Sequence, residues 1–318
     1  MSRRLLCFFL LLPCAALALA RTPAPLAVAV TFDDLPFASV PTQDNAYLGQ
    51  MTDRLLQQLQ ADRVPAVGFV NEAKLSCAGA PDPARVELLR RWVAAGFELG
   101  NHTYSHASLN RLPLDAFMAD LVRGEAVTRP LMQSAGRGLR WFRPPFLHLG
   151  TSPEVRGAFQ DLLAAHGYRV APVSVNSSEW VFAAAYSRAQ AQGDHDAARR
   201  IGDAYLPYMR AVFAWAEQLS LDLFGRPIPH VLLLHANALN ADHFGALAAM
   251  LKQRGYRFVT LDDALGDSAY ATPLGFSGLE GESCLECWAR QAGLRPAQPP
   301  PVPDFVRHRA GPAALECP

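Results

Sequence analysis

The chain has 318 residues, of which 50% are hydrophobic, and its 29 basic and 29 acidic side chains give a formal net charge of zero. This length supports one large domain with a substantial core, or two small domains. The balanced charge, without long runs of one sign, argues against a nucleic-acid-binding protein, which would usually carry a basic excess.

The first 20 residues have the pattern of a signal peptide. Arg3 and Arg4 provide the positive start, Leu5 to Leu12 form a short apolar core, and Ala18-Leu19-Ala20 fits a cleavage site. The apolar core is too short for a transmembrane helix, and no later stretch is apolar enough to span a membrane. The sequence therefore predicts an exported protein, periplasmic or secreted, without stable membrane insertion once the signal is removed.

Strands and helices alternate along most of the remaining chain. The predicted strands cover residues 28–32, 64–70, 97–100, 139–142, 168–175, 231–234 and 257–260. The predicted helices, with apolar residues near helical spacing, cover residues 45–61, 83–95, 114–134, 154–166 and 241–254. This alternation predicts an α/β fold with mainly parallel strands.

One long segment interrupts the alternation. Residues 181–229 are alanine-rich and mostly helical in pattern, with Gly193 and Asp194 as a natural break. We therefore expect a helical hairpin that is inserted into a main domain covering residues 21–270.

The periodic pattern fades after about Pro273. Residues 298–303 are almost all proline, which cannot form a helix or a central strand. We expect residues 271–318 to form a proline-rich, cysteine-containing extension that lies along the surface.

Four cysteines remain after removal of the signal peptide: Cys77, Cys284, Cys287 and Cys317. An even number in an oxidising compartment favours structural disulfides, although the sequence leaves their pairing open. Cys284 and Cys287 have the spacing of half a zinc site, but no second pair of ligands completes it. We therefore favour disulfides over metal binding for these cysteines.

Polar clusters follow the predicted strands directly. They are Asp33-Asp34, Asn101 to His106, Arg143 to Phe146, Asn176 to Trp180, and His235. In an α/β barrel the C-terminal ends of the strands share one rim, where such folds keep their chemistry. The common position predicts that these side chains meet in one site.

A metal site is the first chemistry that these clusters indicate. His102 and His106 are four residues apart, so on a helical turn both could reach one ion. With Asp34 they would form an Asp-His-His site with one open position, which is typical of catalytic zinc. Asp33 would then be available to take a proton from metal-bound water. The same ligand types also suit iron or cobalt.

Three further residues are candidates for the same site. Arg143 precedes two prolines that stiffen the backbone, and it is either a surface arginine in a rigid loop or a guanidinium that holds a carboxylate ionised. His235 ends an apolar strand, as either a buried structural histidine or a general acid. Trp180 is either a core residue or a surface on which a sugar could stack.

Five ordered segments resemble the motifs of the polysaccharide deacetylases, the NodB-homology proteins of carbohydrate esterase family 4. They are Thr31 to Asp34, His102 to His106, Arg143 to Phe146, Glu179-Trp180, and Leu232 to His235. The resemblance spans roughly residues 26–265. It implies a distorted (β/α) barrel and metal-dependent removal of N-acetyl groups from an amino-sugar polymer or oligomer.

The resemblance also implies roles for the metal-side residues. Asp33 would be the general base, and Arg143 would orient it. Asp34, His102 and His106 would hold a divalent metal, with zinc as the first candidate.

The remaining implied roles concern substrate binding and proton donation. His235 would protonate the leaving amine, and Glu179, the acid before Trp180, would tune it. The backbone N–H of Phe146 would help to bind the oxyanion, and we assign Trp180 to substrate binding.

Two residues depart from the family pattern, and residues 181–229 form a longer passage than in compact members. Leu35 stands where a glycine usually follows the two acids, and Glu179 is one methylene longer than the usual aspartate. These departures keep two other hypotheses open: an exported glycan-binding protein with a weakened or relic site, and a structural protein that uses the metal only for stability. Chitin fragments, peptidoglycan and an exopolysaccharide are all candidate glycans.

Overall fold

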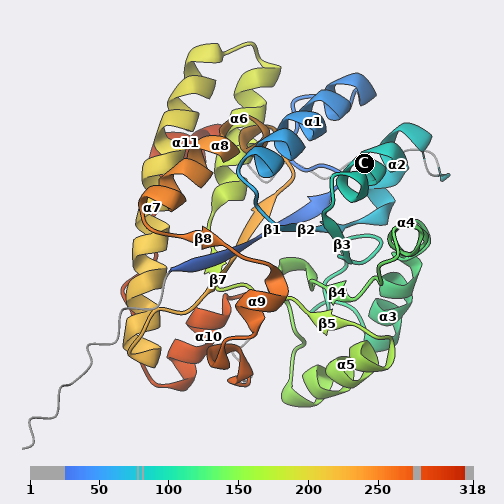
Figure 1. Ribbon diagram of the computed structural model, residues 1–318, viewed down its shortest axis with the longest axis vertical. Helices are drawn as coiled ribbons and strands as arrows, with labels where there is room; N and C mark the ends of the chain where they lie inside the picture. Colours follow the sequence, from blue (N-terminus) through green and yellow to red (C-terminus); the bar gives the residue numbers. More distant parts are fainter. Residues whose placement is uncertain (1–25, 77–78, 81, 275–280, 312–318) are drawn as a thin grey trace, which may run out of the picture.

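The computed structural model describes residues 26–76, 79–80, 82–274 and 281–311. Within these residues the centre of the fold is an eight-stranded parallel sheet (Figure 1). Its strands are β1 (Ala27–Leu35), β2 (Ala66–Val70), β3 (Glu98–Asn101), β4 (Trp141–Phe142), β5 (Arg169–Val170), β6 (Val175–Asn176), β7 (His230–His235) and β8 (Arg257–Phe258). They lie in the order β5-β4-β3-β2-β1-β7-β6, and β8 pairs with the start of β1.

The sheet curls because its two edge strands are joined by a very short connection. β5 and β6 lie on opposite edges, yet only residues 171–174 separate them along the chain. Five backbone steps span at most about 18 Å. The N–H of Ala171 donates to β4 and the N–H of Ser174 donates to β7, so this connection bonds to both sides of the gap. The result is a curled half-barrel, which confirms the predicted fold, whereas the single strand predicted over 168–175 is in fact two strands.

Helices surround the curled sheet (Figure 1). They are α1 (Asn45–Ala61), α2 (Pro83–Ala94), α3 (Leu114–Arg123), α4 (Thr128–Ser134), α5 (Pro153–Ala165), α6 (Glu179–Ala191), α7 (His195–Phe224), α8 (Ala238–Gln253), α9 (Leu261–Leu265), α10 (Cys284–Gln291) and α11 (Asp304–Ala310). Three single 3₁₀ turns are η1 (Glu72–Leu75), η2 (Pro145–Leu147) and η3 (Ser268–Ala271). Phe32 of β1 packs against Trp92 of α2 and Phe244 of α8, with ring centroids 5.6 and 5.8 Å apart. The apolar strand that ends in the two acids is thus fixed in the core.

The helix predicted over residues 114–134 is two helices, α3 and α4. At Gly124, between them, the backbone of residues 103–104 approaches so closely that an added Cβ would lie 2.8 Å from it. The Glu72 carboxylate accepts hydrogen bonds from the first N–H groups of α4 and caps that helix. Packing against the loop after β3 therefore interrupts a helix that periodicity alone would continue.

The alanine-rich segment forms the expected helical hairpin from α6 and α7. The break lies where we predicted it, and the Asp194 carboxylate caps α7 by accepting from the N–H of Ala197 at 3.0 Å. α6 begins at Glu179, earlier than expected, so its first residue follows β6 closely. The division of the chain into a domain, an insertion and an extension stays a prediction.

We expected the C-terminal segment to lie along the surface, but it packs into the core. Leu285 and Trp288 of α10 and Val306 of α11 are buried. α10 packs against α7, and α11 packs against α6. The expectation was wrong because each of these short helices carries few apolar residues. Such a small number does not form a helical periodicity that is visible in the sequence. Residues 298–303 contain neither helix nor strand, as their prolines predict.

Three predictions reach beyond the described residues. The signal peptide at residues 1–20, Cys77 and Cys317 all lie outside them. Cys284 and Cys287 are buried in α10, and disulfide pairing stays a prediction. Among the helices that the structure describes, none is both long and apolar enough to cross a bilayer.

Candidate active site

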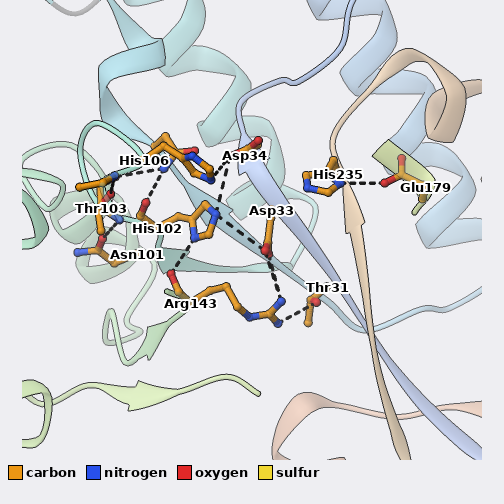
Figure 2. Close-up of polar contacts among 12 residues, drawn as sticks. Thr31, Asp33, Asp34, Asn101, His102, Thr103, His106, Arg143, Glu179 and His235 are labelled. Atoms are coloured by element: carbon orange, nitrogen blue, oxygen red, sulfur yellow. Dashed lines mark hydrogen bonds and ion pairs between the residues drawn. The ribbon is translucent and has the colours of Figure 1, made fainter. Parts of the chain in front are cut away.

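The polar clusters meet at the C-terminal ends of the strands, as Figure 2 shows. β1 and β7 pair in a register that sets Asp33 beside His235. His102 directly follows β3 and Arg143 directly follows β4. Residues that are up to 202 positions apart in sequence therefore share one rim because parallel strands end at the same edge.

Asp34, His102 and His106 form a cluster whose geometry fits a divalent metal. One ligand atom from each lies within 4.8 Å of the others. Asp34 Oδ1 is 3.8 Å from His102 Nε2 and 3.6 Å from His106 Nε2. Zinc bonds of about 2.1 Å in a tetrahedral site would set ligand atoms about 3.4 Å apart. Asp34 Oδ1 is buried, and among the described residues it has no hydrogen-bond partner. An ion between these atoms would satisfy it.

His102 is held in the form that binds a metal. Its Nδ1 lies 2.7 Å from the carbonyl oxygen of Arg143, which can only accept a hydrogen bond. Nδ1 therefore carries the proton, and Nε2 keeps its lone pair toward the cluster. Burial lowers the pKa of His102 to about 4, so the imidazole is neutral at pH 7.

The segment from His102 to His106 is a loop and not the helical turn that we expected. Thr103 and His106 have left-handed backbone angles, with φ of 63° and 58°. The Asn101 side chain accepts from the N–H of Thr103 at 2.7 Å, and the Asn71 amide donates to the carbonyl of His102. The two histidines thus converge because hydrogen bonds fix a strained loop, and not because of helical spacing.

Asp34 has a second partner, Lys74, that sequence reasoning missed. Lys74 Nζ lies 3.3 Å from Asp34 Oδ2. Burial raises the pKa of Asp34, but Lys74 and the nearby histidines outweigh it and hold this pKa well below its usual range. The carboxylate therefore stays ionised, with Oδ1 toward the histidines and Oδ2 toward the lysine. The position of Lys74 just after β2 was the only signal in the sequence.

Asp33 forms a buried ion pair with Arg143. Both carboxylate oxygens of Asp33 lie 3.4 Å from the same guanidinium nitrogen, and the other terminal nitrogen donates to Thr31 Oγ1 at 3.0 Å. Arg143 is fully buried and its guanidinium lies 4.6 Å from the centre of the Phe69 ring. Burial raises the pKa of Asp33, and the charge of Arg143 limits this rise. Asp33 is therefore an oriented carboxylate with an increased affinity for a proton.

His235 contacts a carboxylate on the side away from Asp33 (Figure 2). Its Nδ1 lies 2.8 Å from Glu179 Oε2, and the fully buried Glu179 also accepts from the amides of Asn237 and Asn240. Burial lowers the pKa of His235, but the hydrogen bond and charge of Glu179, with Asp34 and Asp33, raise it to about 9. His235 is therefore protonated at neutral pH.

The comparison with protein families agrees with this geometry. Residues 20–171 match the model of the polysaccharide deacetylase family. This match, over a little under half of the chain, supports the resemblance to the polysaccharide deacetylases. The matched span contains Asp33, Asp34, both histidines of the metal cluster and Arg143, whereas Glu179 and His235 lie beyond it.

Individual relatives match a larger part of the chain. A chitin deacetylase of Colletotrichum lindemuthianum is 25% identical over 249 residues, which cover 77% of this chain and 81% of that protein. An uncharacterized 30.6 kDa protein of Geobacillus stearothermophilus is 26% identical over 238 residues, covering 73% and 72%. The solved structure of the Colletotrichum chitin deacetylase has a TM-score of 0.50 at 24% identity, with 76% of this chain and 88% of that chain covered. This structural likeness supports the shared fold.

The two departures from the family pattern are accommodated locally in this protein. Glu179 reaches His235 despite its extra methylene. Leu35 is buried, and its side chain fills the space beside Gly68 of β2, where an added Cβ would lie 2.5 Å from Leu35 Cδ2. A glycine on the neighbouring strand thus makes room for the larger side chain on β1.

Two half-exposed aromatic residues lie next to residues of the site. Phe146, in η2, has a left-handed backbone with φ of 58°, and its ring centroid lies 4.4 Å from that of His106. Trp180 directly follows Glu179 at the start of α6. Each side chain is 49% exposed, so neither belongs to the core. Phe146 therefore lies on the side of the Asp34, His102 and His106 cluster, and Trp180 lies on the side of His235.

Proposed function

We propose that the protein is a metal-dependent N-deacetylase that hydrolyses N-acetyl groups of an amino-sugar polymer or oligomer. One observation carries this proposal. A three-residue metal cluster, an oriented carboxylate and a protonated imidazole converge at the same rim, and these are the parts that amide hydrolysis requires.

Asp34, His102 and His106 would hold the metal, with zinc as the first candidate and iron or cobalt as alternatives. Such an ion polarises the acetamide carbonyl and makes water a better nucleophile when it is bound. Lys74 would keep Asp34 ionised and leave Oδ1 for the metal.

Asp33 would be the general base. Water attacks the acetamide carbon, and its proton passes to the Asp33 carboxylate. The contacts of Arg143 with Asp33 and Thr31 would keep this carboxylate in place. The raised pKa of Asp33 increases its capacity to take the proton.

His235 would be the general acid. Its proton passes to the amine nitrogen as the C–N bond breaks, so that acetate and the free amine leave. Nδ1 bonds to Glu179, which stabilises the imidazolium and leaves Nε2 as the donating atom. This hydrogen bond supports Glu179 as the residue that tunes His235, as the family resemblance implies.

The substrate would lie between the two aromatic rings. The backbone N–H of Phe146 would bind the oxyanion, and the rings of Phe146 and Trp180 would stack on sugar units. The relative from Colletotrichum lindemuthianum is a chitin deacetylase, which makes N-acetylglucosamine oligomers the first substrate to test. Peptidoglycan and exopolysaccharide are alternatives. We further propose export through a signal peptide to the periplasm or medium.

Acetate release tests the proposal. Metal-stripped protein should release no acetate from N-acetylglucosamine oligomers or peptidoglycan fragments, and addition of zinc should start the reaction. Full zinc occupancy and saccharide binding without acetate release from any substrate would contradict the proposal and favour a glycan-binding protein with a relic site.

A further inference from the structure

We propose that Gly281, in the C-terminal segment, is a positioning residue that sets the backbone of Phe146 for oxyanion binding. This inference rests on the deacetylase function proposed above. Gly281 belongs to none of the five motifs and lies more than 130 positions from Phe146 in sequence.

Gly281 lies directly against the main chain of Phe146. A Cβ added to Gly281 would overlap the carbonyl oxygen of Phe146 and would lie 2.8 Å from its carbonyl carbon. If the neighbouring group were a flexible side chain, it could rotate away from the added Cβ. The neighbouring group is a backbone carbonyl, which can move only together with its loop. Glycine is therefore the one residue type that permits this approach.

The loop that carries Phe146 has little freedom to withdraw. Pro144 and Pro145 restrict the backbone before it, and the N–H of Leu147 donates back to the carbonyl of Pro144 at 3.0 Å. Phe146 itself is in the left-handed region, and its ring packs on His106. Displacement of the carbonyl must therefore change the backbone angles of Phe146 itself.

The segment that carries Gly281 is equally fixed. Three residues later, the N–H of Cys284 donates to the carbonyl of Val173 at 2.7 Å. Ser283 and Glu286 form a reciprocal cap at the start of α10, and Leu285 is fully buried. Val173 belongs to the short connection that closes the curled sheet. The C-terminal segment is thus hydrogen-bonded to the connection that closes the half-barrel, and this holds Gly281 against the active-site loop.

The expected consequence concerns the reaction and not substrate affinity. The N–H and the carbonyl of Phe146 flank the same Cα, so displacement of one moves the other. An oxyanion donor must lie about 2.7–3.1 Å from the oxyanion, and loss of one donor costs about 10²–10³ in kcat. We expect Gly281→Ala to lower kcat about 10- to 100-fold through partial misplacement. KM and zinc affinity should change less than about twofold, since the substitution replaces no metal ligand.

The test compares Gly281→Ala with Gly157→Ala. Gly157 lies in α5, where an added Cβ meets open space, so this control should keep wild-type kinetics. Besides kcat, KM and zinc affinity, the ¹H–¹⁵N amide signal of Phe146 is followed in protein labelled with ¹⁵N-phenylalanine. Loss of that signal in Phe146→Leu assigns it. Gly281→Ala should shift it, and Gly157→Ala should not.

Wild-type kcat in Gly281→Ala, or an unmoved Phe146 amide signal, would overturn the inference. If Gly281→Ala does not fold, the double variant Gly281→Ala/Phe146→Gly should fold, because glycine at 146 lets the loop yield. Failure of both to fold would also overturn the inference. If wild-type protein releases no acetate, the proposed function fails, while the amide signal still decides the positioning role.

Discussion

The two sides of the active site contain the same side chain in opposite states. His102 and His235 are both largely buried at one rim, and burial lowers the pKa of each. His102 has a pKa of about 4, whereas His235 has a pKa of about 9. The difference follows from the group at Nδ1, which is the carbonyl of Arg143 for His102 and the carboxylate of Glu179 for His235. The neutral partner leaves His102 uncharged, as the proposed metal ligand must be, and the anionic partner keeps His235 protonated, as the proposed proton donor must be.

The largest expected effect separates the two roles. His102→Ala should lose both zinc and activity. His235→Ala should keep full zinc occupancy and lose about 10²–10⁴ in kcat, since only the proton donor is removed. Zinc content by atomic absorption and acetate release measure the two properties independently. Loss of zinc in His235→Ala would contradict the division of roles.

Asp33→Asn should resemble His235→Ala. Asparagine cannot take the proton from water, so we expect a loss of about 10²–10⁴ in kcat while the protein still binds zinc through Asp34, His102 and His106. Acetate release and zinc content are again the measurements. Retained turnover would remove Asp33 from the role of base.

Glu179→Gln tests the anionic partner directly. The amide oxygen of glutamine can still accept from His235 Nδ1, but the charge that raises the pKa is gone. Because His235 must be protonated to act, the loss of activity at rising pH should begin at a lower pH. At pH 8 we expect kcat to fall on the order of 10- to 100-fold. Glu179→Asp, as the matched control, should keep the wild-type profile, and an unchanged profile in Glu179→Gln would refute the tuning role.

In metal-free protein, the contributions of the two histidines to the free energy of unfolding should depend on pH in opposite directions. The raised pKa of His235 gives a contribution that is complete below pH 6.5 and is lost as pH rises through about 9. The lowered pKa of His102 gives a contribution that is present above pH 6.5 and is lost as pH falls through about 4. Each is worth at most about 3 kcal/mol. Urea unfolding across this range should show that Glu179→Gln loses the alkaline decrease alone; retention of that decrease would contradict the assignment.

The smallest expected effect concerns the aromatic ring on the His235 side. Trp180→Ala should raise KM for N-acetylglucosamine oligomers about 3- to 10-fold, as expected for one lost stacking contact. Zinc affinity should not change, because Trp180 is not one of the three proposed metal ligands. Steady-state kinetics with oligomers of increasing length measure this effect, and an unchanged KM would assign the ring another role.

The strand-end clusters were predictable from sequence because the fold sets their position. An apolar run followed by polar residues marks the end of a parallel strand, and such ends share a rim. This reasoning found Asp33, Asp34, His102, Arg143 and His235 without knowledge of the structure. The curled sheet then confirmed the predicted fold class.

The features that sequence reasoning missed depend on tertiary contacts. Lys74 and Gly281 lie against residues far along the chain, so no local pattern marks them. The helix over 114–134 is broken by a loop that packs on Gly124, and the strand over 168–175 is divided by the gap in the sheet. His106 reaches the cluster through a left-handed loop that the four-residue spacing with His102 did not predict.

The most direct test of this two-imidazole site is an NMR titration of the histidine side chains in metal-free protein, with His102→Ala and His235→Ala used for assignment. We predict that the His235 imidazole titrates near pH 9 and that the His102 imidazole stays neutral down to about pH 4. Titration of His235 at or below pH 6.5 would contradict its role as the proton donor, and titration of both histidines at the same pH would remove the distinction on which the proposed mechanism depends.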